Sequence, residues 1–145
     1  MPKLSPKPIK VKLLHPDAQL PTRAYAGDAG LDLYAIEDSI IPAGKHGLIK
    51  FGLAVEIPEG YVGFIKDRGS MGRSGLHVIG GVMDSNYRGE YICSMINASD
   101  SDYKIEKGHR VAQLVILPYF TGLPSEADEL SESERGEKRY ASSGK

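Results

Sequence analysis

The chain has 145 residues, and its 18 lysines and arginines nearly balance its 19 aspartates and glutamates, leaving a formal net charge of −1. This length suits one domain, and the charge balance argues against the broad basic surface that gathers nucleic acid. A single cysteine excludes an internal disulfide, and no apolar run is long enough to cross a bilayer, so we expect a soluble cytoplasmic protein without nucleic-acid or membrane partners.

The first strand is expected directly after a short N-terminal arm. Residues 1–8 contain three prolines and no periodic pattern, which predicts a loose arm. Ile9, Val11 and Leu13 then alternate with two lysines, and a period of two is typical of a half-buried strand.

Turn signals divide the following residues into further short strands. Residues 31–35 have an extended pattern, and the turns at 42–44 and 58–60 each place a proline two residues before a glycine. The strand-like runs at 48–57 and 61–66 adjoin these turns, so we expect hairpins in series.

The middle of the chain predicts one short helix and two central strands. Residues 67–75 contain three glycines, and outside the tail this is where a short helix is expected. The most apolar runs, 91–97 and 111–117, are predicted as central strands. The sum is an all-β domain over residues 9–122, of sandwich or barrel type.

Composition changes sharply towards the C-terminus. Residues 125–134 are acidic and rich in serine, while residues 135–145 collect positive charge, one tyrosine and small residues. Such a segment is too polar to hold itself against a core, so residues 123–145 are predicted to form a flexible arm. On composition alone, a frayed terminus without function is the simpler interpretation.

The segment 75–91, GLHVIGGVMDSNYRGEY, combines apolar runs with polar groups. Its double glycine, Gly80-Gly81, predicts a tight hairpin turn because glycine accepts positive φ without steric cost. Asp84 and Tyr87 follow, so the hairpin backbone and these side chains could together hold a small planar ligand. From these residues alone, an ordinary β-turn is the favoured alternative.

A second polar group lies at Arg68-Gly69-Ser70. A guanidinium, backbone amides exposed by glycine and a hydroxyl all suit phosphate oxygens. An ordinary surface turn has the same composition, and the spacing is not that of a Walker P-loop. The four histidines are scattered without the spacing of metal ligands; they are His15, His46, His77 and His109.

Five stretches, in order along the chain, resemble the motifs of the trimeric dUTP pyrophosphatases (dUTPases). They are AGLDLY (29–34), DRGSMG (67–72), GGVMDSNYRGE (80–90), GHRVAQL (108–114), and RG (135–136) with YASSG (140–144). The resemblance implies a jelly-roll-like β-barrel that forms a homotrimer, in which three subunits share each active site. It also implies that the C-terminal arm carries the fifth motif and closes over the nucleotide.

The resemblance further implies the reaction. Such an enzyme uses Mg²⁺ and hydrolyses dUTP to dUMP and pyrophosphate by in-line attack of water on the α-phosphorus. This reaction limits uracil incorporation into DNA and supplies dUMP for thymidylate synthesis. Asp84 would orient and deprotonate the water, and Asp32 would hold Mg²⁺ indirectly, through its bound waters.

The resemblance also assigns the remaining site residues. The catalytic set that it implies, besides the water-activating carboxylate, is Arg68, Ser70, Gln113 and Arg135. For substrate binding, Tyr87 would lie under the deoxyribose and Tyr140 would stack on uracil. The other substrate-binding residues that it implies are Gly69, Val78, Gly81, Val82, Met83, Ile92, Ser142 and Ser143.

Several residues depart from the family pattern. Asp67 stands where the second motif has proline, and Gly69 replaces its first serine. In the fifth motif Lys138-Arg139 replaces a double glycine and Ala141 replaces a glycine, which predicts a stiffer, more cationic arm. These departures keep open a non-catalytic nucleotide-binding regulatory protein. A dCTP deaminase-like or bifunctional relative of the same fold is a second open alternative.

Overall fold

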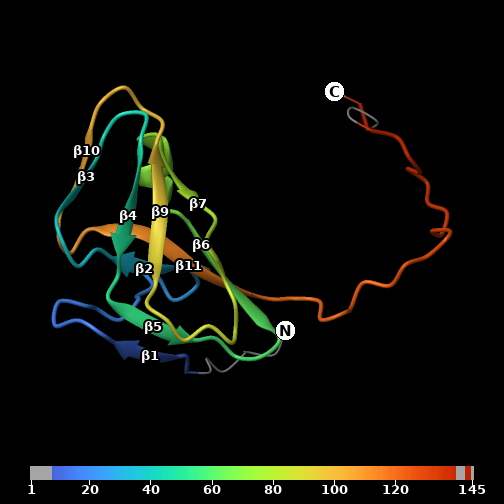
Figure 1. Cartoon of the computed structure of the whole chain (residues 1–145), viewed down its shortest axis with the longest axis horizontal. Coiled ribbons are helices and arrows are strands. Elements are labelled where there is room, and N and C mark those ends of the chain that lie inside the picture. Colours follow the sequence, from blue (N-terminus) through green and yellow to red (C-terminus); the bar gives the residue numbers. More distant parts are fainter. Residues whose placement is uncertain (1–7, 140–142, 145) are drawn as a thin grey trace.

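The strands of the chain are short and are separated by turns, as the glycine and proline content predicts. The computed structural model describes residues 8–139, 143 and 144. Its elements are β1 (Lys10–Leu13), β2 (Leu31–Tyr34), β3 (Ser39–Ile41), β4 (His46–Lys50), β5 (Leu53–Glu56), β6 (Tyr61–Asp67), α1 (Gly69–Arg73), β7 (Leu76–Ile79), β8 (Val82–Met83), β9 (Ile92–Asn97), β10 (Tyr103–Ile105) and β11 (Arg110–Pro118). The fold is all-β and jelly-roll-like, with one short helix among the described residues (Figure 1).

Strand pairing joins distant parts of the chain. The larger sheets have the orders β2-β11-β6-β8 and β4-β9-β7, and two further pairs are β1-β5 and β10-β3, all antiparallel. None of these pairs joins consecutive strands, so the expectation of hairpins in series is wrong. The prediction of central strands is confirmed, because β9 and β11 each have a neighbour on both sides.

One hydrophobic core connects the sheets. Strand β9 alternates between inward Cys93 and Met95, which are buried, and outward Ser94 and Ile96, which are partly exposed. The core cluster takes residues from both larger sheets and from β5, with Tyr91 and Phe51 as its largest members. Removing each such side chain from water contributes about 1.5–3 kcal/mol, so this cluster fixes how the sheets meet.

The short helix α1 confirms the expectation for residues 67–75. Its side chain Met71 is buried and accepts a hydrogen bond from the hydroxyl of Tyr103 at 3.3 Å. Gly75 follows with a φ of +86°, and its N–H donates to the carbonyl of Gly72. A glycine with positive φ directly after the last turn commonly ends a helix. Gly75 therefore explains why α1 ends at Arg73.

The double glycine connects two sheets and does not close a hairpin. Gly80 and Gly81 have φ values of +74° and +92°, so the conformation inferred from the sequence is present. However, β7 pairs with β9, whereas β8 pairs with β6. The Gly81 carbonyl accepts the Ile65 N–H at 2.8 Å, which fixes the connection against β6.

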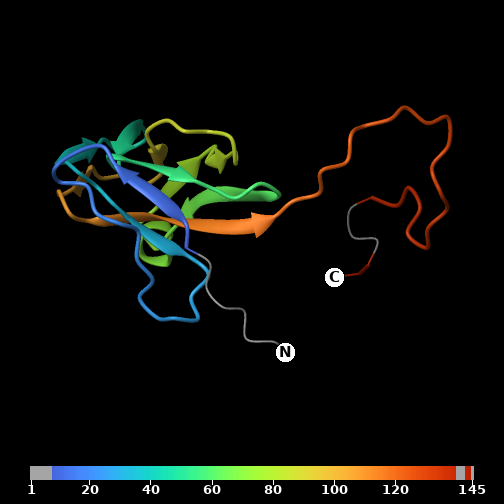
Figure 2. The same ribbon diagram turned by 90° about the horizontal axis from the view of Figure 1, so that it is seen from below.

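After β11 the chain leaves the body of the fold. Residues 119–139 contain no strand or helix and are exposed, and Figures 1 and 2 show them extending away from the sheets. Three apolar side chains in this segment are almost fully exposed: Phe120 at 92%, Leu123 at 92% and Leu130 at 90%. Among the described residues, no helix is long and apolar enough to span a membrane.

Candidate active site

Three of the five motifs meet in one pocket of about 520 Å³. Asp32 comes from β2, Arg68 precedes α1, and Gln113 lies on β11; the same pocket includes Gly30, Gly69 and Ser70. They meet because β11 lies between β2 and β6, so that Gln113 faces Asp32 on one side and Lys66 on the other. Strand pairing therefore assembles groups that are far apart in sequence.

Asp32 and Arg68, which both line this pocket, form an ion pair. The Asp32 residue is 8% exposed, and its Oδ1 accepts from Nε of Arg68 at 3.0 Å. Its Oδ2 lies 3.5 Å from a guanidinium nitrogen of Arg110, whose carbonyl in turn accepts from Arg68. The guanidinium of Arg68 is thus held in place by two acceptors.

The amide of Gln113 is held across the pocket. Its Nε2 donates to the Asp67 carbonyl at 2.7 Å, which uses one of its two N–H groups. A Cβ on Gly30 would overlap the Gln113 amide, coming within 2.8 Å of its Cδ. A side chain at position 30 would therefore displace the Gln113 amide from its present place, which is a physical reason for a glycine in the first motif.

The chemistry of the donor set fits a magnesium ion held mainly by its waters and by substrate phosphates. Two carboxylates, Asp28 and Asp32, line the pocket, and no group of three or more His, Cys, Asp or Glu side chains among the described residues could hold a metal. Magnesium keeps several waters and often takes one or two carboxylates together with phosphates. Asp32, the one of these two carboxylates that lies in the first motif, fits a role through such waters.

Asp67 has a structural role that the sequence did not reveal. Its carboxylate accepts the Val78 N–H and lies near Nδ1 of His77, both at 2.6 Å. It thereby joins β6 to β7 beside the pocket, in place of the family proline. Since Asp67 uses the Val78 N–H, that amide does not face an open ligand surface. A carboxylate at a strand end was the only signal in the sequence.

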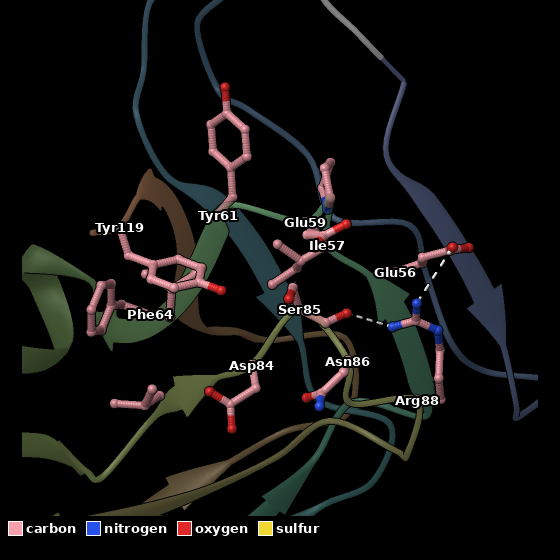
Figure 3. A pocket seen from close by; sticks show the side chains of 13 residues that line it. Glu56, Ile57, Glu59, Tyr61, Phe64, Asp84, Ser85, Asn86, Arg88 and Tyr119 are labelled. Carbon is pink, nitrogen blue, oxygen red and sulfur yellow. Dashed lines mark hydrogen bonds and ion pairs between the residues drawn. The ribbon is translucent and has the colours of Figure 1, made fainter. Parts of the chain in front are cut away.

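Asp84 lies in a different and larger groove, of about 970 Å³. Val82, Ser85 and Asn86 line it with Asp84, and β6 and the chain after β11 supply aromatic rings (Figure 3). Arg88 donates to the Ser85 carbonyl at 2.6 Å and pairs with Glu56 at 3.4 Å. In Figure 3 the Asp84 carboxylate points away from this pair.

The other candidate residues in and beside the third motif differ in exposure. Val78 is buried, Met83 is partly buried, and Val82 and Ile92 are exposed on the surface. Tyr87 is 42% exposed, and its ring stacks on that of Tyr91. Tyr87 does not line the Asp84 groove.

The described part of the C-terminal arm lies apart from both cavities. Arg135 is exposed, and its Nε donates to the carbonyl of Lys138 at 3.0 Å. Ser143 is also exposed, whereas Tyr140 and Ser142 lie outside the described residues. Within one chain the candidate residues therefore occupy three places: the Asp32 pocket, the Asp84 groove with its surroundings, and the arm.

The fold and the arginine-containing pocket define a jelly-roll-like all-β protein equipped to hold anionic groups. Residues 16–144 match the sequence model of the dUTPase family, and the chain belongs to that family. The deoxyuridine 5'-triphosphate nucleotidohydrolase of Clostridium tetani is 41% identical over 140 residues, which cover 94% of this chain and 97% of the relative.

Two solved phage structures are similar to the chain. The dUTPase of Staphylococcus bacteriophage 80alpha, with dUPNHPP, has a TM-score of 0.90 and 33% identity; the match covers 96% of this chain and 99% of that one. A mutant dUTPase of phage phi11 of S. aureus, described as revealing the coordination of a structural Mg(II) ion, has a TM-score of 0.79 and 28% identity over 85% and 98% of the two chains.

Proposed function

We propose that this protein hydrolyses dUTP to dUMP and pyrophosphate with Mg²⁺, by in-line attack of water on the α-phosphorus. The observation that carries the proposal is the meeting of Asp32, Arg68 and Gln113 in one pocket. The sequence relatives named for this activity and the phage structure with dUPNHPP support the same substrate. The product dUMP would feed thymidylate synthesis in the cytoplasm and keep uracil out of DNA.

The pocket would bind the triphosphate. Arg68 provides guanidinium donors, Gln113 a second amide N–H, and Gly69 with Ser70 the backbone amides and hydroxyl at the start of α1. Magnesium would add charge neutralisation on the phosphates. Because phosphoryl transfer depends mainly on positioning and electrostatics, fixing Arg68 through Asp32 before binding lowers the reorganisation needed.

Asp84 and the residues around its groove would activate water and recognise the nucleoside. Asp84 would accept a proton from the attacking water, a role that requires hydrogen-bond reach of that water. Tyr87 would lie under the deoxyribose, and the backbone at Gly81, Val82 and Met83, with Ile92 beside it, would face uracil. Arg135 would reach the γ-phosphate, and the arm residues Tyr140, Ser142 and Ser143 would close over the nucleotide.

A homotrimer would unite these groups. The Asp32 pocket and the Asp84 groove have no lining residue in common, so one chain does not offer all the catalytic groups to one ligand. A symmetric assembly that places the groove of one subunit against the pocket of the next, with the arm from a third, completes a shared site.

The decisive experiment measures pyrophosphate release from each deoxynucleoside triphosphate and from UTP, with Mg²⁺. We expect turnover of dUTP alone, and a loss of about 10²–10⁴-fold in Asp84→Asn because the general base is removed. Asp100→Asn is the matched control, since Asp100 is an exposed turn acid outside both cavities. Native protein that leaves dUTP intact would refute the proposal.

Two further measurements on the native protein, ammonia release and nucleotide binding, separate the two alternatives. Ammonia release from dCTP would indicate a deaminase-like or bifunctional enzyme. Tight dUTP binding without turnover by the native protein would indicate a regulatory nucleotide-binding protein.

A further inference from the structure

The ring of Tyr87 is fixed on several sides although much of it faces solvent. Its hydroxyl donates to the Glu90 carbonyl at 3.0 Å, and its N–H donates to the Asp84 carbonyl at 3.1 Å. The ring stacks on that of Tyr91, with 6.2 Å between centroids and 26° between planes. One side of the ring therefore rests on the protein while 42% of the residue stays open to a ligand.

Tyr91 is unusual among the buried residues. It is 0% exposed and belongs to the core, yet among the described residues its hydroxyl is the one buried side-chain oxygen or nitrogen without a hydrogen-bond partner. Burying an unpaired hydroxyl costs about 1–3 kcal/mol. A phenylalanine would fill almost the same volume without this cost, so core packing needs the aromatic ring at this position and not the hydroxyl.

We propose, building on the function proposed above, that Tyr91 is a positioning residue: its buried ring supports Tyr87 and thereby sets the discrimination between deoxyribose and ribose. A sugar with a 2′-hydroxyl differs from deoxyribose by one oxygen atom. A ring that excludes this atom must be held in place, because a misplacement of about 1 Å is enough to change catalysis strongly.

Gly89 limits the position of the ring near its hydroxyl end. A Cβ at position 89 would overlap the Tyr87 hydroxyl and come within 2.6 Å of Cζ and 2.9 Å of Cε2. The absence of a side chain at Gly89 therefore leaves room for the Tyr87 ring in the position where it stacks on Tyr91. Two changes disturb this position in opposite ways: Tyr91→Leu removes the support, and Gly89→Ala pushes the ring away.

The test compares native protein with Tyr91→Phe, Tyr91→Leu and Gly89→Ala. Steady-state kinetics give kcat and KM for dUTP and for any turnover of UTP, and calorimetric titration with the non-hydrolysable α,β-imido analogues of dUTP and UTP gives the two Kd values with Mg²⁺. We expect Tyr91→Phe to keep the native dUTP-to-UTP preference. Tyr91→Leu and Gly89→Ala should lower this preference at least about tenfold, the scale on which small steric differences are discriminated.

Phe51→Leu is the matched control for general damage to the core. Phe51 is also fully buried, and its N–H donates to the Tyr91 carbonyl at 3.2 Å. This variant should lower stability in thermal unfolding without changing the dUTP-to-UTP preference. An equal loss of preference in Phe51→Leu would overturn the proposed role of Tyr91.

The experiments give different results if the proposed dUTP hydrolysis is wrong and if the proposed positioning role of Tyr91 is wrong. A native protein that binds dUTP in preference to UTP but does not hydrolyse it would refute the hydrolase, and the Kd ratios of the variants would still test Tyr91. Folded Tyr91→Leu with native kinetic and Kd ratios would refute the positioning role. A native protein without preference for either nucleotide would refute both.

Discussion

At the scale of single residues, two buried polar side chains differ in whether their hydrogen bonds are satisfied. Asn97 is fully buried, and its side chain donates to the carbonyls of Ile41 and Ser101 while accepting from the N–H of Ser99. Tyr91 is equally buried, but its hydroxyl has no partner among the described residues. The first group is satisfied, whereas the second carries a desolvation cost that a substitution can remove.

Tyr91→Phe should therefore stabilise the protein, by about 1 kcal/mol, because it removes an unpaired hydroxyl and keeps the ring. Urea unfolding at fixed protein concentration measures the change in unfolding free energy. Tyr103→Phe is the control, since the Tyr103 hydroxyl donates to the sulfur of Met71. Stabilisation of equal size in both variants would contradict this explanation.

The same substitution should change the alkaline pH dependence of stability. Burial raises the pKa of Tyr91 to about 12, above the ordinary value of about 10. Between these values the unfolded chain loses a proton that the folded chain keeps, so the contribution is present below about pH 10 and is lost as pH rises towards 12.

Native stability should therefore fall more steeply than that of Tyr91→Phe from about pH 10 to 12, by up to about 1.4 kcal/mol per pH unit. Urea titrations at several alkaline pH values measure this difference. Burial also raises the pKa of Cys93 to about 12, but this contribution is common to both proteins and cancels. Parallel curves for the two proteins would show that Tyr91 titrates normally.

At the scale of elements, the connection between β7 and β8 depends on its two glycines in unequal ways. Both have positive φ, which costs an L-residue about 1–2 kcal/mol. A Cβ on Gly80 would meet nothing within 4 Å, whereas a Cβ on Gly81 would lie 2.6 Å from the Ile65 carbonyl oxygen. Only Gly81 is packed against the backbone of β6.

Gly81→Ala should consequently destabilise the protein more than Gly80→Ala. We expect a cost of about 1–2 kcal/mol for Gly80→Ala from backbone conformation alone. In Gly81→Ala the clash with Ile65 adds to this cost and pushes β8 away from β6. Thermal unfolding of the two variants under identical conditions measures the difference, and equal losses would show that the contact with Ile65 relaxes freely.

At the scale of the whole molecule, the body and the C-terminal segment differ in what holds them. The body has a single core that joins its sheets, while residues 121–139 are exposed throughout. The whole fold also separates the Asp32 pocket from the Asp84 groove, because this separation follows from the arrangement of β11, β6 and β8 in one sheet.

A chain that ends after Leu130 should fold like the full chain but have little dUTPase activity. The removed residues contribute no buried side chain in the described part of the chain, so the unfolding midpoint should be unchanged. Activity should fall because the closure of the site that we propose for Arg135 and the arm would be lost. Calorimetry, gel filtration and pyrophosphate release measure fold, assembly and turnover. Normal turnover would exclude a catalytic role for the arm.

The sequence by itself determined the local features of this protein. Alternation, proline and glycine signals predict short strands, the helix at α1 and the positive φ of Gly80 and Gly81, because these depend on neighbouring residues. The ordered motifs indicated the family, which the comparison confirmed. The structure places the motif residues Asp32, Arg68 and Gln113 in one pocket, and their roles towards a substrate stay a prediction.

Only the tertiary structure decided which strands pair and which side chains meet. Backbone hydrogen bonds are alike for every strand, so the choice of partner strand follows from burial of a common core. The strands therefore form long-range pairs in place of the expected hairpins. For the same reason the burial of Tyr91 in the core, which fixes the ring that stacks on Tyr87, and the use of Asp67 to hold β7 are absent from any local pattern. Such contacts exist only once distant segments have packed together.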